Sequence, residues 1–259
     1  MQSDRSRGRR WKSLTQVLRA VKRGGLLLTL RKFFRFAISR ISAYKSQKGQ
    51  DRWVLETLRN KEGGYFVDLA ASDGVTFSNT WVLEKKFGWD GIAIEPNPYF
   101  FPNLVRSRSC KVLELVVDSE AGVAPFRIDI GGLGGIVADD TANNARLRGD
   151  QLEHAEIAQL PAKTLTEVLD EAGAPATMDY LSLDVEGAEE RVIRGLDLDR
   201  YTFYCMTIEQ PNEEVNRLLL DHGYRFVKNE MCDTFYVHES HPFFEMIERH
   251  PFEAFQRKS

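Results

Sequence analysis

Short apolar segments alternate with amphipathic segments between residues 65 and 238 of this chain. We expect strands near 65–69, 91–95, 112–116, 124–128, 179–183 and 203–208, and helices near 76–87, 98–107, 164–172, 187–194 and 212–222. A final pair of segments, 224–227 and 234–238, predicts an antiparallel hairpin. Alternating strands and helices are typical of a mostly parallel sheet, to which this hairpin adds an antiparallel edge. The pattern therefore predicts an α/β fold.

The N-terminal residues follow a different pattern. Apolar positions from Leu26 to Ile41 recur at spacings of three and four, and Arg and Lys fill much of the rest. We therefore divide the chain into a basic N-terminal helical arm, residues 1–45, and a domain, residues 46–259. A basic amphipathic helix suits an anionic membrane surface, here through residues 11–45. The alternative is that its apolar face covers the domain's own core, as most amphipathic helices do.

Charge is divided in nearly the same place. Residues 1–50 contain 14 Lys or Arg and one acid, whereas the rest of the chain contains 21 basic and 37 acidic residues. This asymmetry indicates different partners for the two parts, and the acidic domain disfavours nucleic acid near its active site. The three cysteines are widely spaced and form no CxxC pair, which favours a reducing compartment. With no secretory signal or membrane span evident, we expect a cytoplasmic protein, at most peripheral to the inner face of a membrane.

Residues 65–74 are the most informative segment. An apolar strand runs into a turn of small residues, with Asp68 before the turn and Asp73 within it. Such a turn lets the backbone approach a bound ligand closely. The next apolar strand ends at Glu95-Pro96, and a carboxylate at that position can accept both hydroxyls of a ribose. The two strand ends predict a nucleoside-containing cofactor.

Two later strands also end in acids. Asp184 and Glu186 follow strand 179–183, and Glu209 follows strand 203–208. In a doubly wound sheet, ligands bind at the carboxyl ends of the strands, where the strand order reverses. Because buried acids need partners to offset their desolvation, acids at successive strand ends favour a cofactor with a cationic or hydroxyl-rich face.

Motifs found in order along residues 46–238 make the assignment more specific. They are Ser46-Gln47, Gly49-Gln50-Asp51, Tyr65–Asp68, Asp73–Thr80, Gly88-Trp89, Ile94–Pro98, Thr164-Leu165 and Asp179–Glu189. Together they resemble the FkbM family of S-adenosylmethionine-dependent methyltransferases. The resemblance implies a class I methyltransferase (Rossmann-like) fold, with a seven-stranded, mostly parallel sheet and an antiparallel C-terminal hairpin.

The resemblance also implies roles for individual residues. The methionine end of the cofactor would be lined by Asp68, Ala70, Ser72, Asp73 and Gly74. Ser78 and Asn79, in the first turn of the following helix, would add polar contacts. Glu95, with Pro96, would hold the ribose, and Asp118 and Ser119 would lie near the adenine. Asp184 would lie beside the transferring methyl group, and Gln50 and Asp51 would close the pocket from the N-terminal side.

One position departs from the family pattern. The family usually has glycine where this chain has Ala70. Glycine provides conformational freedom and space for the cofactor, so an alanine fits only if its φ is negative. We therefore expect weakened cofactor binding. A second unusual segment, residues 129–160, is a long polar insertion that is either a substrate lid or solvated filler.

The resemblance suggests an O-methyltransferase that modifies a hydroxyl of a glycan, polysaccharide, glycolipid or related natural product. A sugar hydroxyl is weakly acidic, so a base or a metal should assist its deprotonation. Asp184 and Glu209 are the candidate bases, and the same two carboxylates are alternatively candidate ligands for Mg²⁺.

Two other classes of protein compete with this interpretation. An NAD-dependent or nucleotide-sugar enzyme could also use Glu95, but the turn lacks Gly-x-Gly-x-x-Gly and Asp73 would repel a pyrophosphate. A non-catalytic scaffold on the same fold is favoured by Ala70 alone. Retention of Glu95, Asp118 and Asp184 argues against it.

Overall fold

The computed structural model describes residues 44–129, 131–144, 147 and 153–255. Residues from Tyr44 onward belong to one compact unit. The predicted arm helix lies outside the described residues, so its structure and the predicted domain boundary stay predictions. Within the described part of the chain, no helix is long and apolar enough to cross a membrane.

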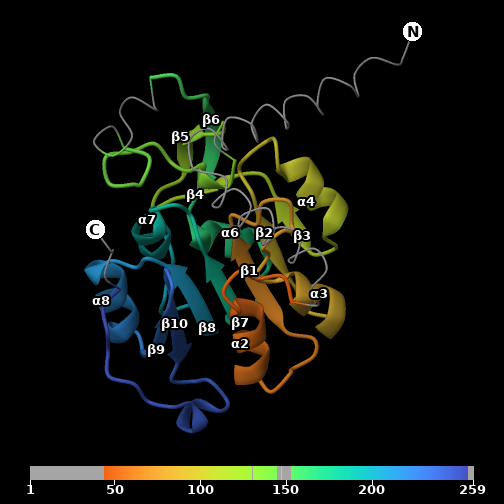
Figure 1. The fold of residues 1–259 in the computed structure, drawn as a ribbon, viewed down its shortest axis with the longest axis vertical. Helices are drawn as coiled ribbons and strands as arrows, with labels where there is room; N and C mark the ends of the chain where they lie inside the picture. Colours follow the sequence, from red (N-terminus) through yellow and green to blue (C-terminus); the bar gives the residue numbers. More distant parts are fainter. Residues whose placement is uncertain (1–43, 130, 145–146, 148–152, 256–259) are drawn as a thin grey trace, which may run out of the picture. The chain divides into compact units, whose positions relative to one another are not determined.

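A seven-stranded sheet forms the centre of this unit (Figure 1), in the order β3-β2-β1-β7-β8-β10-β9. The strands are β1 (Tyr65–Leu69), β2 (Asp90–Ile94), β3 (Lys111–Leu113), β7 (Thr177–Leu183), β8 (Thr202–Glu209), β9 (Tyr224–Glu230) and β10 (Asp233–His238). The last strand, β10, lies between β8 and β9 and is antiparallel to both, whereas the other pairs are parallel. This arrangement confirms the predicted class I methyltransferase fold.

Helices cover both faces of the sheet. On one face lie α6 (Leu165–Ala172), α7 (Glu189–Arg194) and α8 (Glu213–Asp221); on the other lie α2 (Gln50–Thr57), α3 (Trp81–Phe87) and α4 (Phe101–Ser107). Successive residues of β1 divide between these layers, since Val67 and Leu69 pack with the first group and Phe66 packs with the second. Successive side chains of a strand point to opposite faces, so a continuously apolar strand needs a helical layer on each side.

A three-stranded sheet, ordered β4-β6-β5, corrects two sequence expectations. Its strands are β4 (Val116–Val117), β5 (Gly122–Arg127) and β6 (Ile157–Lys163), and two short 3₁₀ helices, η1 (Gly131–Leu133) and η2 (Phe244–Met246), complete the elements. The single strand expected at 112–116 is wrong, because the chain leaves the large sheet after Leu113 and joins the small one at Val116.

The sequence pattern does not predict strand β6, because its first residues belong to the insertion expected at 129–160. Pro161 lies inside β6, and a proline argues against a central strand because it has no N–H. The structure accommodates it because β4 pairs only with Ala162 and Lys163, which leaves Pro161 with a single neighbouring strand. Ile136 and Thr141 of the insertion are buried, so this part of it packs on the domain.

Helix α3 begins five residues later than expected, whereas the other predicted helices agree to within three residues. The Asp73 carboxylate accepts the backbone N–H groups of Val75 (2.9 Å) and Thr76 (2.7 Å) and so forms a separate turn. Phe77 then adopts a positive φ of 61° and pairs with Ser46 in an isolated bridge. The chain therefore crosses to the N-terminal segment before the helix starts.

Candidate functional site

Left-handed backbone follows three neighbouring strands of the large sheet at their carboxyl ends. The residues are Ala70 (φ 61°) and Ser72 (φ 53°) after β1, Glu186 (φ 56°) after β7 and Gln210 (φ 43°) after β8. Non-glycine residues in this region are strained, and such residues cluster at functional sites. The strand order reverses at β1, between β2 and β7, which is where ligands bind in open α/β sheets.

Glu95 joins the ends of β1 and β2. One carboxylate oxygen accepts the N–H of Ser72 (2.7 Å), and the other accepts the N–H of Asn97 (2.8 Å). Burial raises the pKa of Glu95 to about 7, against the opposing effect of these two hydrogen bonds. Each oxygen keeps a second lone pair, so the pair can still accept two hydroxyls of a diol.

Ala70 is exposed at the end of β1 and has a positive φ. The condition for an easy fit, a negative φ, is therefore not met. A left-handed alanine places its Cβ close to the backbone, a cost that glycine does not have. The departure from glycine at this position thus strains the turn itself.

Asp68 is held inside the domain. It accepts the hydroxyl of Thr80 (2.5 Å), and the guanidinium of Arg108 lies 3.9 Å away. Arg108, itself buried, also binds Thr80 (2.9 Å) and Glu84. Burial raises the pKa of Asp68, although Arg108 opposes this effect. Asp68 therefore fastens β1 to the start of α3, and its contact with a cofactor stays a prediction.

Three other residues proposed for the cofactor shape the turn. Asp73 closes the turn described above, and the Ser78 hydroxyl accepts the N–H groups of Thr80 (3.2 Å) and Trp81 (3.0 Å). A Cβ on Gly74 would lie 2.4 Å from the hydroxyl of Ser107, so this glycine is required for packing against α4. Ser78 and Asn79 were expected in the first helical turn; the structure places both before α3.

Asn79 has a feature that the sequence does not reveal. Its Nδ2 donates to the hydroxyl of Ser182 on β7 (2.9 Å), while its buried Oδ1 has no hydrogen-bond partner in the described structure. Leaving a buried acceptor unpaired costs about 1–3 kcal/mol. An unpaired carbonyl oxygen beside β7 therefore fits a ligand that donates a hydrogen bond.

Asn143 also lacks partners and was missed by sequence reasoning, because it lies in an undistinguished polar run. Its side chain is fully buried, and neither carboxamide atom has a partner among the described residues. It packs close to Gly135, where an added Cβ would lie 2.7 Å from Nδ2 and 3.4 Å from the Cβ of Glu186. The insertion thus brings a carboxamide against the loop after β7.

Asp118 is paired within the protein. Its two oxygens accept from Arg191 of α7 at 2.7 and 3.0 Å, and Arg191 also binds Asp140 of the insertion (3.0 Å). Ser119 donates its N–H to Asp118 (2.6 Å). The segment after β4 is therefore fastened to α7, and the proposed adenine contacts of Asp118 and Ser119 stay predictions. The geometry does not assign a cofactor contact to Pro96 either.

Asp184 and Glu209, proposed as catalytic, lie together. Leu183 of β7 pairs with Ile208 of β8, so the next residue of each strand faces the other. Ligand oxygens of Asp184, Glu186 and Glu209 lie within 4.8 Å of one another. Burial raises the pKa of Asp184 well above its ordinary value, and a hydrogen-bonded Glu209 raises it further. Asp184 therefore holds its proton more readily than an ordinary aspartate does.

A second group, missed from the sequence, adjoins this pair. Glu209, Cys232 and Asp233 also bring their oxygen and sulfur atoms within 4.8 Å of one another. Lys48 donates to Asp233 (2.9 Å) and Cys232 (2.5 Å), and Gln50 donates to the other oxygen of Asp233. The segment before α2 thus covers the ends of β8 and β10. No short motif signals this, since its partners are 183–185 residues apart.

Asp51, proposed beside Gln50 as a pocket-closing residue, organises the same segment. It is fully buried and accepts the backbone N–H of Lys45 (2.8 Å) and the hydroxyl of Ser46 (2.5 Å). Its role in the structure is to hold the loop before α2, which in turn presents Lys48 and Gln50 to β10.

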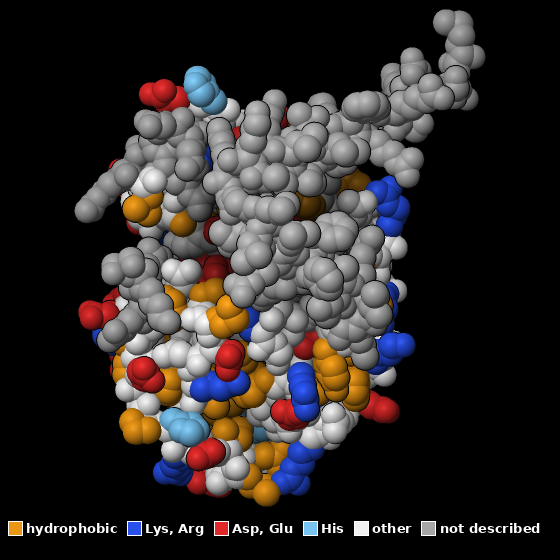
Figure 2. All heavy atoms as spheres, in the orientation of Figure 1, with side chains coloured by type: hydrophobic (Ala, Val, Ile, Leu, Met, Phe, Trp, Pro, Cys, Tyr) orange, Lys and Arg blue, Asp and Glu red, His pale blue; other side chains and the backbone are white. Residues whose placement is uncertain are grey.

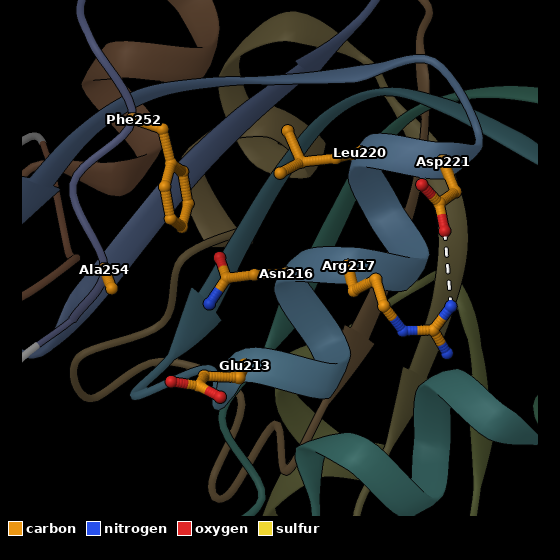
Figure 3. A pocket seen from close by; sticks show the side chains of 7 residues that line it. All are labelled: Glu213, Asn216, Arg217, Leu220, Asp221, Phe252 and Ala254. Carbon is orange, nitrogen blue, oxygen red and sulfur yellow. Dashed lines mark hydrogen bonds and ion pairs between the residues drawn. The ribbon is translucent and has the colours of Figure 1, made fainter.

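A separate hollow lies between α8 and the C-terminal segment (Figure 3). It is lined by Glu213, Asn216, Arg217, Leu220, Asp221, Phe252 and Ala254. Its charged Arg217 is paired with Asp221 (3.3 Å), and none of the residues proposed for cofactor binding or catalysis lines it. This hollow is therefore not part of the candidate site.

Comparison with known proteins shows what this chain is similar to. A family model described as the methyltransferase FkbM domain matches residues 68–226, more than half of the chain. No curated protein matches the sequence. A solved methyltransferase FkbM from Methylobacillus flagellatus KT is 12% identical, with a TM-score of 0.43, over 80% of this chain and 59% of that one. A precorrin-6y C5,15-methyltransferase from Geobacter metallireducens GS-15 is also 12% identical, with a TM-score of 0.40, over 72% and 85%.

Replacing the strained alanine provides a direct test of the turn. We expect Ala70→Gly to increase the free energy of unfolding by about 1 kcal/mol, because glycine adopts a positive φ without steric cost. The matched control is Ala71→Gly, at a buried neighbour without a positive φ, which should decrease stability. Urea unfolding measures both changes. Equal or lower stability of Ala70→Gly relative to the parent protein would contradict the assignment of strain.

Proposed function

Because the chain belongs to the FkbM family of S-adenosylmethionine-dependent methyltransferases, we propose that it methylates a hydroxyl of a glycan, glycolipid or related natural product. The observation that carries this proposal is the pair of carboxyl groups, Asp184 and Glu209, at the ends of neighbouring strands. They lie in the same sheet edge as the Glu95 turn, so a bound cofactor and a general base would share one site.

The described residues fit the cofactor. Glu95 has lone pairs for the ribose hydroxyls, and the unpaired Oδ1 of Asn79 suits the cofactor's amino group. Ala70, at the end of β1, is exposed, so a ligand can approach the turn there. S-adenosylmethionine supplies a methyl group that its sulfonium already activates. The protein therefore has to align the acceptor oxygen with that methyl group and remove the hydroxyl proton.

The acid pair can perform the proton transfer. In its ionised form a carboxylate of this pair can accept the proton of the acceptor hydroxyl, and the raised pKa of Asp184 makes that side chain a stronger base than an ordinary aspartate. The alternative is that these carboxylates, with Glu186, hold Mg²⁺, which prefers oxygen ligands. In that arrangement the ion, rather than a base alone, would lower the pKa of the hydroxyl.

Methyl transfer to a panel of glycans and glycolipids tests the function. We expect a mass increase of one methyl group on a hydroxyl of at least one acceptor, and Asp184→Asn to reduce kcat by roughly 100-fold or more, as for loss of a general base. Glu213→Gln, a change on α8 away from the site, serves as the control. If the methyl group is found on nitrogen or carbon instead, the proposed acceptor chemistry is wrong.

The same assay separates a base from a metal. If the reaction depends on Mg²⁺, activity should be lost in EDTA, because the acceptor hydroxyl would no longer be activated. Adding Mg²⁺ should then restore the activity. Full activity in EDTA would leave the carboxyl pair as the base.

Cofactor affinity should depend on pH through Glu95. Its pKa of about 7 means that the carboxylate, the form that accepts hydroxyls, is lost as pH falls through 7. The ionised fraction changes from about one tenth at pH 6 to about nine tenths at pH 8, so affinity for S-adenosylmethionine should rise about tenfold. Glu95→Gln should bind weakly and lose this component of the pH dependence. Calorimetry at pH 6 and pH 8 measures the affinity of each protein for S-adenosylmethionine. The same pH dependence in the parent and in Glu95→Gln would contradict the role of Glu95.

We also propose that residues 11–45 associate with an anionic membrane surface. The support is the excess of Lys and Arg in the arm. On the face of the domain seen in Figure 2, by contrast, acidic and basic side chains of the described residues are intermingled. A face of mixed sign gives little attraction to a polyanion, and acids outnumber bases in residues 51–259, so nucleic acid is not proposed as a partner.

Liposome co-sedimentation tests the arm. Binding should require anionic lipid, weaken with salt and disappear when residues 1–45 are removed, because the attraction is electrostatic. Equal binding to neutral liposomes, or binding by the truncated protein, would exclude this role.

A further inference from the structure

Lys48 is a largely buried amine that contacts neighbours of the acid pair, and neither the proposed reaction nor the resemblance assigns it a role. Its side chain is 8% exposed, and its ammonium lies 2.9 Å from Asp233 and 2.5 Å from the Cys232 sulfur. Asp233 begins β10 directly opposite Glu209 of β8. The ammonium therefore contacts the residues that flank one member of the acid pair.

This ammonium occupies the position of a bound cation. Glu209, Cys232 and Asp233 form a set of oxygen and sulfur atoms close enough to hold a metal ion. Lys48 already forms hydrogen bonds to two of the three. Among the ion pairs of the described residues, no other Lys or Arg is joined to Asp184, Glu209 or Asp233. Acidic groups gathered away from water require such a cation to offset their repulsion.

The contact also fixes the position of Glu209. The Cys232 sulfur lies within 4.8 Å of a Glu209 carboxylate oxygen, and a Glu209 oxygen lies within 4.8 Å of one of Asp184. A line of close groups thus runs from Lys48 through Cys232 to both carboxyl groups of the pair. Gln50 binds the other oxygen of Asp233, so this segment stays attached to β10 without the ammonium. Removing the charge of Lys48 should therefore displace the carboxyl groups of Asp184 and Glu209 more than it destabilises the fold.

We propose that Lys48 is a positioning residue for methyl transfer: its ammonium takes the cation position between Cys232 and Asp233 and so holds Glu209 and Asp184 in register. The proposal rests on the proposed function of this pair. It also implies that Lys48 prevents a metal ion from binding to Glu209, Cys232 and Asp233. Metal binding by the other group, Asp184, Glu186 and Glu209, does not depend on Lys48.

Three substitutions in the full-length protein test the role. Lys48→Met removes the charge while keeping most of the side chain, and should reduce kcat at least tenfold while changing the affinity for S-adenosylmethionine less than twofold. Lys48→Arg retains the charge and should recover much of the loss. Lys61→Met is the control, since Lys61, which is more exposed, forms an ion pair with Asp179 of β7 (2.7 Å) away from the acid pair, and it should leave kcat unchanged.

A metal titration supplies a readout that does not need an acceptor. Zinc chloride alone, measured by calorimetry, should bind Lys48→Met at least tenfold more tightly than the parent, because the vacated position offers one sulfur and two carboxylate ligands. Adding Cys232→Ser to Lys48→Met should remove the gain. S-adenosylmethionine binding by the parent is measured in parallel, so that failure of the cofactor assignment is recognised separately.

Unchanged kcat in Lys48→Met would overturn the positioning role, as would an equal loss in Lys61→Met. Zinc affinity equal to that of the parent protein would overturn the assignment of the cation position. If Lys48→Met does not fold, Lys48→Gln replaces it, because it also removes the charge while it keeps a polar end group that can hydrogen-bond to Asp233. The same loss of kcat is then expected, and parent-like activity would refute the proposal.

Discussion

The register between β7 and β8 is the constraint on which the candidate site depends. With Leu183 opposite Ile208, the strands end together and the acids that follow them face each other. A shift of one residue would turn one side chain to the opposite face of the sheet and separate the pair. The register is itself fixed by burial, because Leu181, Leu183, Met206 and Ile208 fill the core beneath α6, α7 and α8. The apolar core thus determines where the acids meet.

Paired charges, together with a small apolar cluster that includes Ile128, Ile136 and Ala188, hold the loops above this core. Arg108 ties Asp68 to α3, Arg191 ties Asp118 to the insertion, and Lys48 ties Asp233 to the segment before α2. Each cation joins segments that are distant in sequence, and each pairs an acid that would otherwise be costly to bury. This explains why several acids proposed as cofactor ligands are already satisfied by the protein, while Glu95 and Asn79 retain acceptor capacity.

The sequence predicted the large sheet and the meeting of Asp184 with Glu209, because apolar runs and strand-end acids are local signals. It missed β6, since a proline in a middle strand reads as a break, and it placed the start of α3 too early, since the side-chain bonds of Asp73 replace the first helical turn. Lys48 had no local signal at all: its partners are 184 and 185 residues away. Local patterns therefore predict strands and their ends, whereas pairings across the fold require the structure.

The negative charge of the site affects how strongly it attracts the cofactor before and after methyl transfer. Three acids, Asp184, Glu209 and Asp233, gather at the strand ends, and among the ion pairs of the described residues Lys48 supplies the one ammonium that is joined to them. The remaining negative charge favours a cationic ligand, and the sulfonium of S-adenosylmethionine is one. After transfer the cofactor becomes a neutral thioether, so this attraction is lost. The acidic groups of the site would therefore attract the methyl donor more strongly than the demethylated product.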